Sequence, residues 1–278
     1  MNGIIDVGGG MRGVYTAGIY DYLLDKNIKL DYCLGISAGS ANMCNYLSGQ
    51  RGRNLKSYLV YSHSPKYMGF GNFLRTGSYI NMDYIYSELC NSDTADEPLD
   101  FSAMKANPAR FIVGATNALT GRAHYFTIDD MAQDNYDIMK ASCAVPAVNK
   151  PYFIGGVPYY DGGISVPIPY KKAFADGCEK LIVLLTRPAD YRRSPVKYKP
   201  LLKTVMHKYP MAYRAFSTRH LRYNRELDEL EKMSDRVLIA APSDICGMTT
   251  LKNDNEAMKR LYKMGYADGE KIADFLRK

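Results

Sequence analysis

The sequence contains no tryptophan, only four histidines and no paired cysteine motif, and these absences exclude whole classes of protein. No two of the six cysteines form a C-x-x-C motif, and no cysteine–histidine cluster has the spacing of a zinc site. No run of about 18–20 apolar residues occurs, which excludes a conventional membrane-spanning helix. We therefore expect no metal ion, and nothing in the sequence calls for a cofactor.

The first residues, MNGIID, lack the basic and long apolar regions of a signal peptide. On that ground we expect a cytoplasmic protein with reduced thiols. The chain has 278 residues, of which 46% are apolar and 23% charged, and this balance is typical of a globular protein. No linker rich in proline, glycine or serine divides it, so we expect a single domain over residues 1–278.

Apolar patterns near the N-terminus predict a strand at 3–7, a helix at 14–24 and a second strand at 32–36. A strand, a crossover helix and a strand form a βαβ unit, whose strands are parallel. The same reasoning predicts strands at 111–115, 123–127, 181–186 and 237–241 and helices at 40–47, 134–142, 169–176 and 255–276. Residues 62–77 and 91–108 are expected to be irregular. The pattern indicates an α/β fold with a mainly parallel sheet.

The strongest local motif is G-x-S-x-G at Gly35–Gly39, between the strand at 32–36 and the helix at 40–47. This context is typical of a nucleophile elbow, in which Ser37 takes strained backbone angles and Gly35 and Gly39 prevent clashes. The Ser37 hydroxyl would then project at the carboxyl edge of the sheet. The alternative is an ordinary turn in which Ser37 caps a helix.

A glycine-rich loop, Gly8-Gly9-Gly10-Met11-Arg12-Gly13, follows the first strand. Consecutive glycines allow several backbone N–H groups to point at one anion, either an acyl oxyanion or a phosphate. The loop also fits G-x-G-x-x-G, but a dinucleotide site needs an acidic residue at the end of the second strand. Ser37 follows that strand instead, which favours acyl chemistry.

Asp161-Gly162-Gly163 follows a hairpin-like segment at 152–160. Asp-Gly-Gly alone is a common turn. Beside a serine nucleophile, however, an aspartate held on a tight turn can supply the base that the serine needs.

These three motifs, in this order, resemble those of the patatin-like phospholipases, with the bacterial intracellular branch most similar. The resemblance covers roughly residues 3–186 and implies a three-layer α/β/α fold and lipid acyl hydrolysis without a catalytic metal. It implies a Ser37–Asp161 dyad, with Ser37 as the nucleophile and Asp161 as the base. The loop Gly8, Gly9, Gly10, Met11, Arg12 and Gly13 would form the oxyanion hole. The competing class is a non-catalytic phosphate- or nucleotide-binding α/β protein.

Two further points stay open at the level of sequence. His207 and His220 follow Asp161 in the order of a Ser–Asp–His triad, although both lie in a basic segment. Arg12 could orient a substrate phosphate or carboxylate beside the loop, or it could pair with a nearby carboxylate such as Asp6.

Residues 191–225 carry ten Lys and Arg and no Asp or Glu, within a net charge of +7 for the whole chain. Apolar side chains alternate with these cations, so we expect a basic helical insertion or flap at about 191–234. Such an element could contact an anionic membrane at the inner membrane face, or it could be a solvated flap over the sheet. No recognition motif is present, and we expect no nucleic acid partner.

Overall fold

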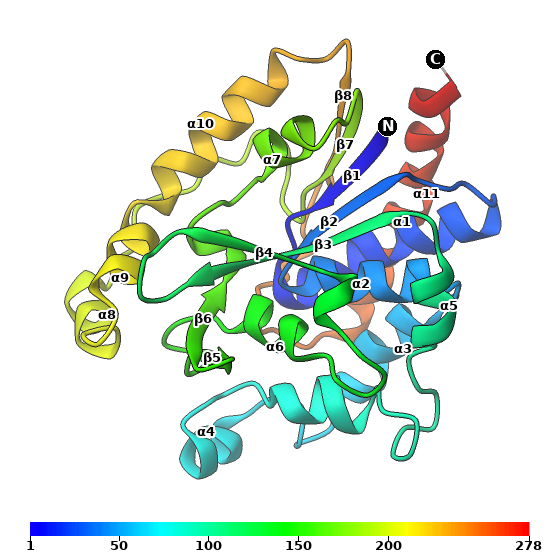
Figure 1. Cartoon of the computed structure of the whole chain (residues 1–278). Coiled ribbons are helices and arrows are strands. Elements are labelled where there is room, and N and C mark those ends of the chain that lie inside the picture. Colours follow the sequence, from blue (N-terminus) through cyan, green and yellow to red (C-terminus); the bar gives the residue numbers. More distant parts are fainter. Residues whose placement is uncertain (278) are drawn as a thin grey trace.

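The computed structural model describes residues 1–277 and is built around a twisted eight-stranded sheet (Figure 1). The strand order is β5-β6-β3-β2-β1-β7-β8, and β4 pairs with β3 beside this path. The strands are β1 (Asn2–Asp6), β2 (Tyr32–Ile36), β3 (Arg110–Asn117), β4 (Ala123–Thr127), β5 (Tyr152–Ile154), β6 (Val157–Asp161), β7 (Lys180–Leu184) and β8 (Val237–Ala240).

The sheet is mainly parallel, as the sequence predicts. Strands β3, β2, β1, β7 and β8 run parallel to one another, whereas β4, β5 and β6 join by antiparallel pairing. The hairpin β5–β6 pairs with the far end of β3 at Ala115–Asn117. Because β6 ends at Asp161, this pairing brings the Asp-Gly-Gly turn toward the carboxyl edge of the parallel strands.

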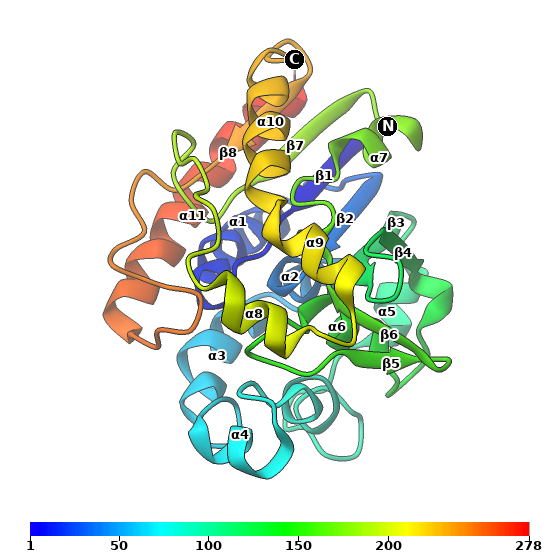
Figure 2. The ribbon, with the colours of Figure 1, turned by 90° about the vertical axis from the view of Figure 1, so that its left-hand side faces the viewer.

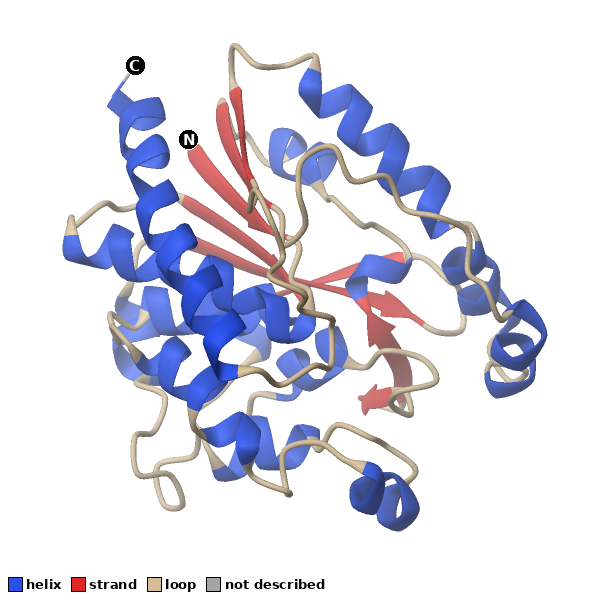
Figure 3. Cartoon of the chain, turned by 180° about the vertical axis from the view of Figure 1, so that it is seen from behind, coloured by secondary structure: helices blue, strands red, loops and turns tan. Residues whose placement is uncertain are grey.

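Helices cover both faces of the sheet, which makes the fold a three-layer α/β/α sandwich (Figure 3). Neighbouring strand residues alternate between the layers: Ile4 joins one core and Ile5 the other. One layer holds α1 (Val14–Asp25), α2 (Ala38–Leu47), α3 (Arg53–Leu59), α5 (Phe101–Ala106), α6 (Asp137–Cys143) and α11 (Asn255–Arg277). The other holds α7 (Tyr170–Ala175) and α10 (Arg219–Glu231). The predicted fold class is therefore confirmed.

The basic segment forms α8 (Lys199–Val205), α9 (Pro210–Ser217) and α10, which border one side of the sheet (Figure 2). Apolar residues of α8 and α9 pack beside the end of β6 and form a small third core with Tyr160 and Ile164. The remaining short elements are α4 (Phe70–Thr76), the 3-10 turns η1 (Gly10–Gly13), η2 (Tyr61–His63), η4 (Ile128–Asp130) and η5 (Gly162–Ile164), and the π-helical turn η3 (Tyr84–Glu88). The single domain over residues 1–278 stays a prediction.

Two of the expected element assignments are wrong, and a third has a different start. The segments 62–77 and 91–108 are not wholly irregular, because they contain α4 and α5. Helix α5 has a local start signal, since the side chain of Asp100 accepts a hydrogen bond from the amide of Ala103. The helix expected at 134–142 begins only at Asp137, because Asp134 has a positive φ of 63° that is incompatible with a helix.

Within residues 1–277, no helix combines the length and the apolar character that crossing a bilayer requires.

Candidate active site

Ser37 lies on a sharp turn between β2 and α2, and its backbone is strained. Its φ of 56° and ψ of −136° lie outside the regions that side-chain-bearing residues usually occupy. The turn places the residue at the N-terminus of α2, where the helix dipole favours negative charge. The backbone therefore has the conformation that a nucleophile elbow requires.

The two glycines of the G-x-S-x-G motif are required by close packing. A Cβ at position 35 would lie 2.4 Å from the Cα of Ser40, and a Cβ at position 39 would lie 2.5 Å from the backbone oxygen of Asp6. Both distances are too short for real contacts, so only glycine permits the turn to fold this tightly. The motif is thus explained by sterics on both sides of Ser37.

The backbone of Ser37 is held by the hydroxyl of Ser142 on α6. The Ser142 Oγ accepts a hydrogen bond from the Ser37 amide at 2.8 Å and donates one to the carbonyl of Gly114 at 2.7 Å. Because Ser142 is fully buried, it links the turn to β3 without competition from water. Sequence reasoning missed this residue, and no local motif marks it.

The glycine loop lies directly against Ser37. A Cβ at Gly8 would lie 3.0 Å from the Cβ of Ser37, and Gly8, Gly9 and Gly10 all have positive φ, at 66°, 150° and 59°. Two of the loop amides are occupied: Gly8 donates to Asp6 Oδ1 at 2.9 Å, and Met11 donates to the carbonyl of Thr250 at 3.0 Å.

The amides of Gly9 and Gly10 have no acceptor among residues 1–277. The assignment of Gly8–Gly13 to an oxyanion hole stays a prediction. Within this loop, the amides of Gly8 and Met11 already donate to Asp6 and Thr250.

Asp161 ends β6 and caps the turn η5. Its Oδ1 accepts a hydrogen bond from the amide of Gly163 at 2.8 Å. A Cβ at Gly162 would lie 2.4 Å from the carbonyl of Gly114, so the turn can approach β3 only with glycine there. Gly162 is therefore a steric requirement for this turn, which places Asp161 in the same cavity as Ser37.

Burial raises the pKa of Asp161 above its ordinary value of 3.8, against hydrogen bonds from the Ser37 side chain and the Gly163 amide that lower it. The positive charges of Arg219 and Arg193 also lower it, by a smaller effect. The carboxylate is partly buried and faces a hydroxyl and two cations. Partial desolvation of this kind makes a carboxylate a stronger base.

Arg12 does not pair with Asp6. Its Nε donates to the carbonyl of Thr186 at 3.1 Å and one terminal nitrogen donates to the hydroxyl of Thr250 at 3.2 Å. Asp6 is instead fully buried beneath Gly39, and burial raises its pKa to about 6. Thr186 also donates its hydroxyl to the carbonyl of Gly8 at 2.6 Å, which ties β7 to the glycine loop.

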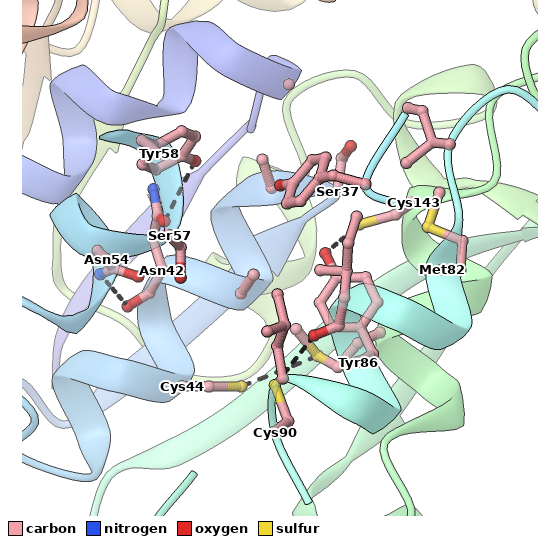
Figure 4. Close-up of a pocket in the computed structure, with 18 of the residues that line it drawn as sticks. Ser37, Asn42, Cys44, Asn54, Ser57, Tyr58, Met82, Tyr86, Cys90 and Cys143 are labelled. Carbon is pink, nitrogen blue, oxygen red and sulfur yellow. Dashed lines mark hydrogen bonds between the residues drawn. The ribbon is translucent and has the colours of Figure 1, made fainter. Parts of the chain in front are cut away.

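Two cavities of different character meet at Ser37, and Gly10, Val145 and Thr250 also line both. The first, about 120 Å³, has a mainly apolar surface, with polar side chains from α2 and α3 (Asn42, Asn45, Arg53, Asn54 and Ser57) on one part of its wall, and is called here the apolar cavity. Figure 4 shows Ser37 and Cys143 near one side of it and Cys44 and Cys90 near the other. The second, about 130 Å³, is called the cationic cavity and contains Asp161 with Arg12, Arg187, Arg193 and Arg219.

None of the four histidines lines either cavity. His207 is exposed and its Nδ1 lies 2.9 Å from the carbonyl of Thr204 in the same helix region, while the Nδ1 of His220 is buried without a partner. The geometry therefore gives no support to a Ser–Asp–His triad. Among residues 1–277, no group of three or more His, Cys, Asp and Glu side chains is arranged to hold a metal ion.

Comparisons with known proteins identify the family. Residues 7–174 match the sequence profile of the family described as patatin-like phospholipase. The chain belongs to the patatin-like phospholipase family. Residues 209–278 of this patatin-like protein also match a second profile, a domain of unknown function designated DUF6363. Both Ser37 and Asp161 lie inside the patatin-like match.

One curated relative is YjjU of Escherichia coli (strain K12), described as an uncharacterised protein. It is 29% identical over 199 residues, which are 69% of this chain and 54% of the relative. A solved structure that matches this chain is that of VipD from Legionella pneumophila. It is 14% identical, with a TM-score of 0.48, and the match covers 98% of this chain and 66% of that one. The chain thus spans about half the length of the curated relative.

Proposed function

We propose that this patatin-like protein is a serine acyl-ester hydrolase of the phospholipase A type, with Ser37 as nucleophile and Asp161 as base. The observation that carries the proposal is the position of Ser37 at the junction of the apolar cavity and the cationic cavity. A lipid ester has an acyl chain on one side of its reacting carbonyl and a polar group on the other. The two cavities match these two sides.

In the first step, the Ser37 Oγ attacks the ester carbonyl and Asp161 accepts the hydroxyl proton. The amides of Gly9 and Gly10, which have no acceptor in residues 1–277, would donate to the oxyanion of the tetrahedral intermediate. One such donor is typically worth about 3 kcal/mol of transition-state stabilisation. The proton on Asp161 then passes to the departing alcohol.

In the second step, a water molecule attacks the acyl-enzyme carbonyl and Asp161 again accepts the proton. The bond between Ser37 Oγ and the acyl group then breaks, the fatty acid leaves, and the proton on Asp161 returns to Ser37 Oγ. An ordinary aspartate is a weak base for an alcohol or water, because its pKa lies near 3.9. Burial raises the pKa of Asp161, and this supplies part of the basicity that the step requires.

The acyl chain would occupy the apolar cavity. Its walls include Met11 and Ala41 beside Ser37 and continue to Leu99, Tyr136 and Met139, all of which are hydrophobic. Burying a methylene group is worth about 0.8 kcal/mol, so such a cavity gains affinity with each carbon of the chain that it accepts. We therefore expect esters of longer fatty acids to be the better substrates.

A fluorophosphonate probe tests the proposal, since it phosphonylates only an activated serine. We expect covalent modification at Ser37 in the wild-type protein, none in Ser37→Ala, and full modification in Ser57→Ala. Ser57 is the matched control because it borders the same apolar cavity on α3. A wild-type protein that is never labelled, and that binds phosphate or nucleotides without turning over esters, would establish the non-catalytic alternative.

The approach to the lipid is proposed to involve α4 and α8, which both project from one side of the molecule (Figure 2). Phe70 and Leu74 of α4 are 67% and 73% exposed, and Leu201 of α8 is 63% exposed. The exposed cations around α8 are Lys197, Lys199, Lys203 and Lys208. Apolar side chains among cations suit contact with anionic lipid, as expected at an inner membrane face.

Co-sedimentation with liposomes tests this contact. We expect binding to vesicles that contain phosphatidylglycerol but not to pure phosphatidylcholine, with loss at high salt. The double variant Lys199→Glu with Lys203→Glu should abolish binding. Lys263→Glu on α11, which lies on another side of the molecule, should leave it unchanged. Equal binding to neutral and anionic vesicles would contradict the electrostatic part of the proposal.

A further inference from the structure

Three arginines from the C-terminal part of the chain converge on the cationic cavity beside Ser37. Arg187 follows β7, Arg193 lies in the loop before α8, and Arg219 begins α10. These three residues are called here the arginine cluster. With Arg12 they give the cavity four cations, whereas Asp161 is the one carboxylate among its lining residues within 1–277.

The arginine cluster has no ion pair within residues 1–277. The neighbouring Arg192 shows the contrast, because it faces outward and pairs with Asp228 at 2.9 Å and Glu231 at 3.0 Å. In the cavity, by comparison, the Nε atoms of Arg193 and Arg219 are buried without any hydrogen-bond partner. A buried charge without a partner is costly, so this arrangement is unfavourable unless an anion enters.

Aromatic faces hold the guanidinium groups in place of carboxylates. Arg187 lies 4.3 Å from the ring centre of Tyr191, Arg193 lies 4.9 Å from that of Tyr223, and Arg219 lies 4.1 Å from that of Phe216. Stacking orders a guanidinium group but consumes none of its N–H donors. The donors of the cluster are therefore positioned and still available to a ligand.

The electrostatics of the cavity agree with this geometry. The pKa of Arg219 is lowered to about 9, mainly by burial and to a smaller extent by the positive charge of Arg193, against the charge of Asp161, which raises it. The pKa of Arg193 is also lowered, mainly by burial. The lowered pKa values mean that the cavity disfavours the charged forms of Arg219 and Arg193, and a bound anion would favour these charged forms.

We propose that the arginine cluster is a phosphate subsite that binds the head-group phosphate of a phospholipid substrate, with preference for a phosphomonoester. The fork of a guanidinium group matches two oxygens of a phosphate, and a dianionic phosphomonoester matches the excess of positive charge best. The subsite deepens the proposed function, since it rests on Ser37 acting on an ester at the mouth of the same cavity. It selects phosphatidate-like lipids over neutral glycerides.

Activity measurements on monomeric lipids test the preference without interference from a membrane surface. The substrates are dihexanoyl phosphatidate and dihexanoyl glycerol, each below its micelle concentration. We expect Arg193→Gln and Arg219→Gln each to lower kcat/KM for phosphatidate by about 10–100-fold, mainly through KM, because each removes charge-assisted hydrogen bonds. Hydrolysis of the glyceride should change by less than about threefold.

The matched control is Arg192→Gln, which removes the same type of charge one position away but on the surface. It should leave both substrates unaffected. An equal loss with both substrates in Arg193→Gln and Arg219→Gln would overturn the subsite, because it would mean that the arginines act only through the charge of Asp161. A wild-type enzyme without preference for phosphatidate would overturn it as well.

Binding of inorganic phosphate to the Ser37→Ala protein provides a test that needs no turnover. We expect phosphate to raise the Tm of this protein at constant ionic strength, and chloride to have no such effect. The shift should vanish when Arg219→Gln is added and persist with Arg192→Gln. Absence of any shift overturns the subsite. A shift in the Ser37→Ala protein together with a wild-type protein that hydrolyses no ester would retain the anion site and refute the proposed function.

Discussion

The apolar cavity and the cationic cavity meet at Ser37 but are built from different parts of the chain. Most residues around the apolar cavity lie within 7–174, the part that matches the patatin-like family. The arginine cluster lies after that match, and Arg219 belongs to the second profile at 209–278. We infer that residues 7–174 supply the reacting groups and the binding site for the acyl chain, while the C-terminal part of the chain recognises the polar group of the substrate.

The strongest test of this comparison removes the group at which both cavities meet. Ser37→Ala should reduce hydrolysis of a long-chain p-nitrophenyl ester by about a millionfold, because loss of a catalytic serine leaves only binding and oxyanion stabilisation. The variant should still bind the acyl chain in the apolar cavity and the polar group in the cationic cavity. Ser57→Ala, measured beside it, should retain wild-type turnover, and comparable loss in both variants would reject Ser37 as the nucleophile.

Removing the base should have the next largest effect. Asp161→Asn should lower kcat by about 10²–10⁴-fold, the usual contribution of general base catalysis. Full activity in this variant would contradict the role of Asp161.

The pH dependence of the wild-type enzyme follows from the same residue. The base must be ionised, and burial raises the pKa of Asp161, so kcat/KM should fall as the pH falls through this raised value. In a plot of kcat/KM against pH, the decrease on the acid side, or acid limb, should therefore occur at a higher pH than it would for an aspartate with an ordinary pKa. Since Arg219 lowers the pKa of Asp161, the limb of Arg219→Gln should move to higher pH on a neutral ester. A limb that does not move would show that the cationic cavity does not act on the base.

Filling the apolar cavity should change chain-length selection and leave the reaction intact. Ala41 on α2 borders this cavity, and Ala41→Leu would occupy space beside Ser37. We expect kcat/KM for a hexadecanoyl ester to fall about tenfold or more and that for a butanoyl ester to change little. Comparing the two p-nitrophenyl esters measures this, and an equal change for both would place the acyl chain elsewhere.

The smallest expected effect on activity comes from removing the Ser142 hydroxyl, which holds the backbone of the turn at Ser37. Ser142→Ala leaves the Ser37 amide and the Gly114 carbonyl without their shared partner, which costs about 1–3 kcal/mol of stability. We expect a lower Tm and a loss in kcat of about tenfold or less, without change in chain-length or head-group preference. A change in preference would mean that Ser142 contacts substrate.

The sequence predicts the local part of this site well because local sterics determine it. The spacing of Gly35 and Gly39 around Ser37 is required by contacts with Ser40 and Asp6, and the elbow conformation follows. Short apolar runs likewise predict the parallel strands, since strands covered on both faces are apolar throughout. The same reasoning fails for α4 and α5, which are too short to show a helical period.

The distribution of the basic residues is the feature that only packing decided. The run at 191–225 predicts one cationic element, yet Arg192 pairs on the surface while Arg193 and Arg219 face the cavity of Ser37. Nothing in the sequence distinguishes Arg192, which pairs on the surface, from the adjacent Arg193, which faces the cavity.

The sequence by itself determined the fold class, through its short apolar runs, and its three glycine motifs brought Ser37, Asp161 and the glycine loop into one hypothesis, because only glycine permits these tight turns. The tertiary structure decided what surrounds them. Thr186 bonds to Gly8, Thr250 bonds to Met11 and Arg219 reaches the cavity of Asp161 because the segment after β7, the 241–254 loop and the start of α10 come together with the glycine loop and Asp161. Such contacts join residues far apart in the chain, and the packing of whole elements, which no local pattern records, sets them.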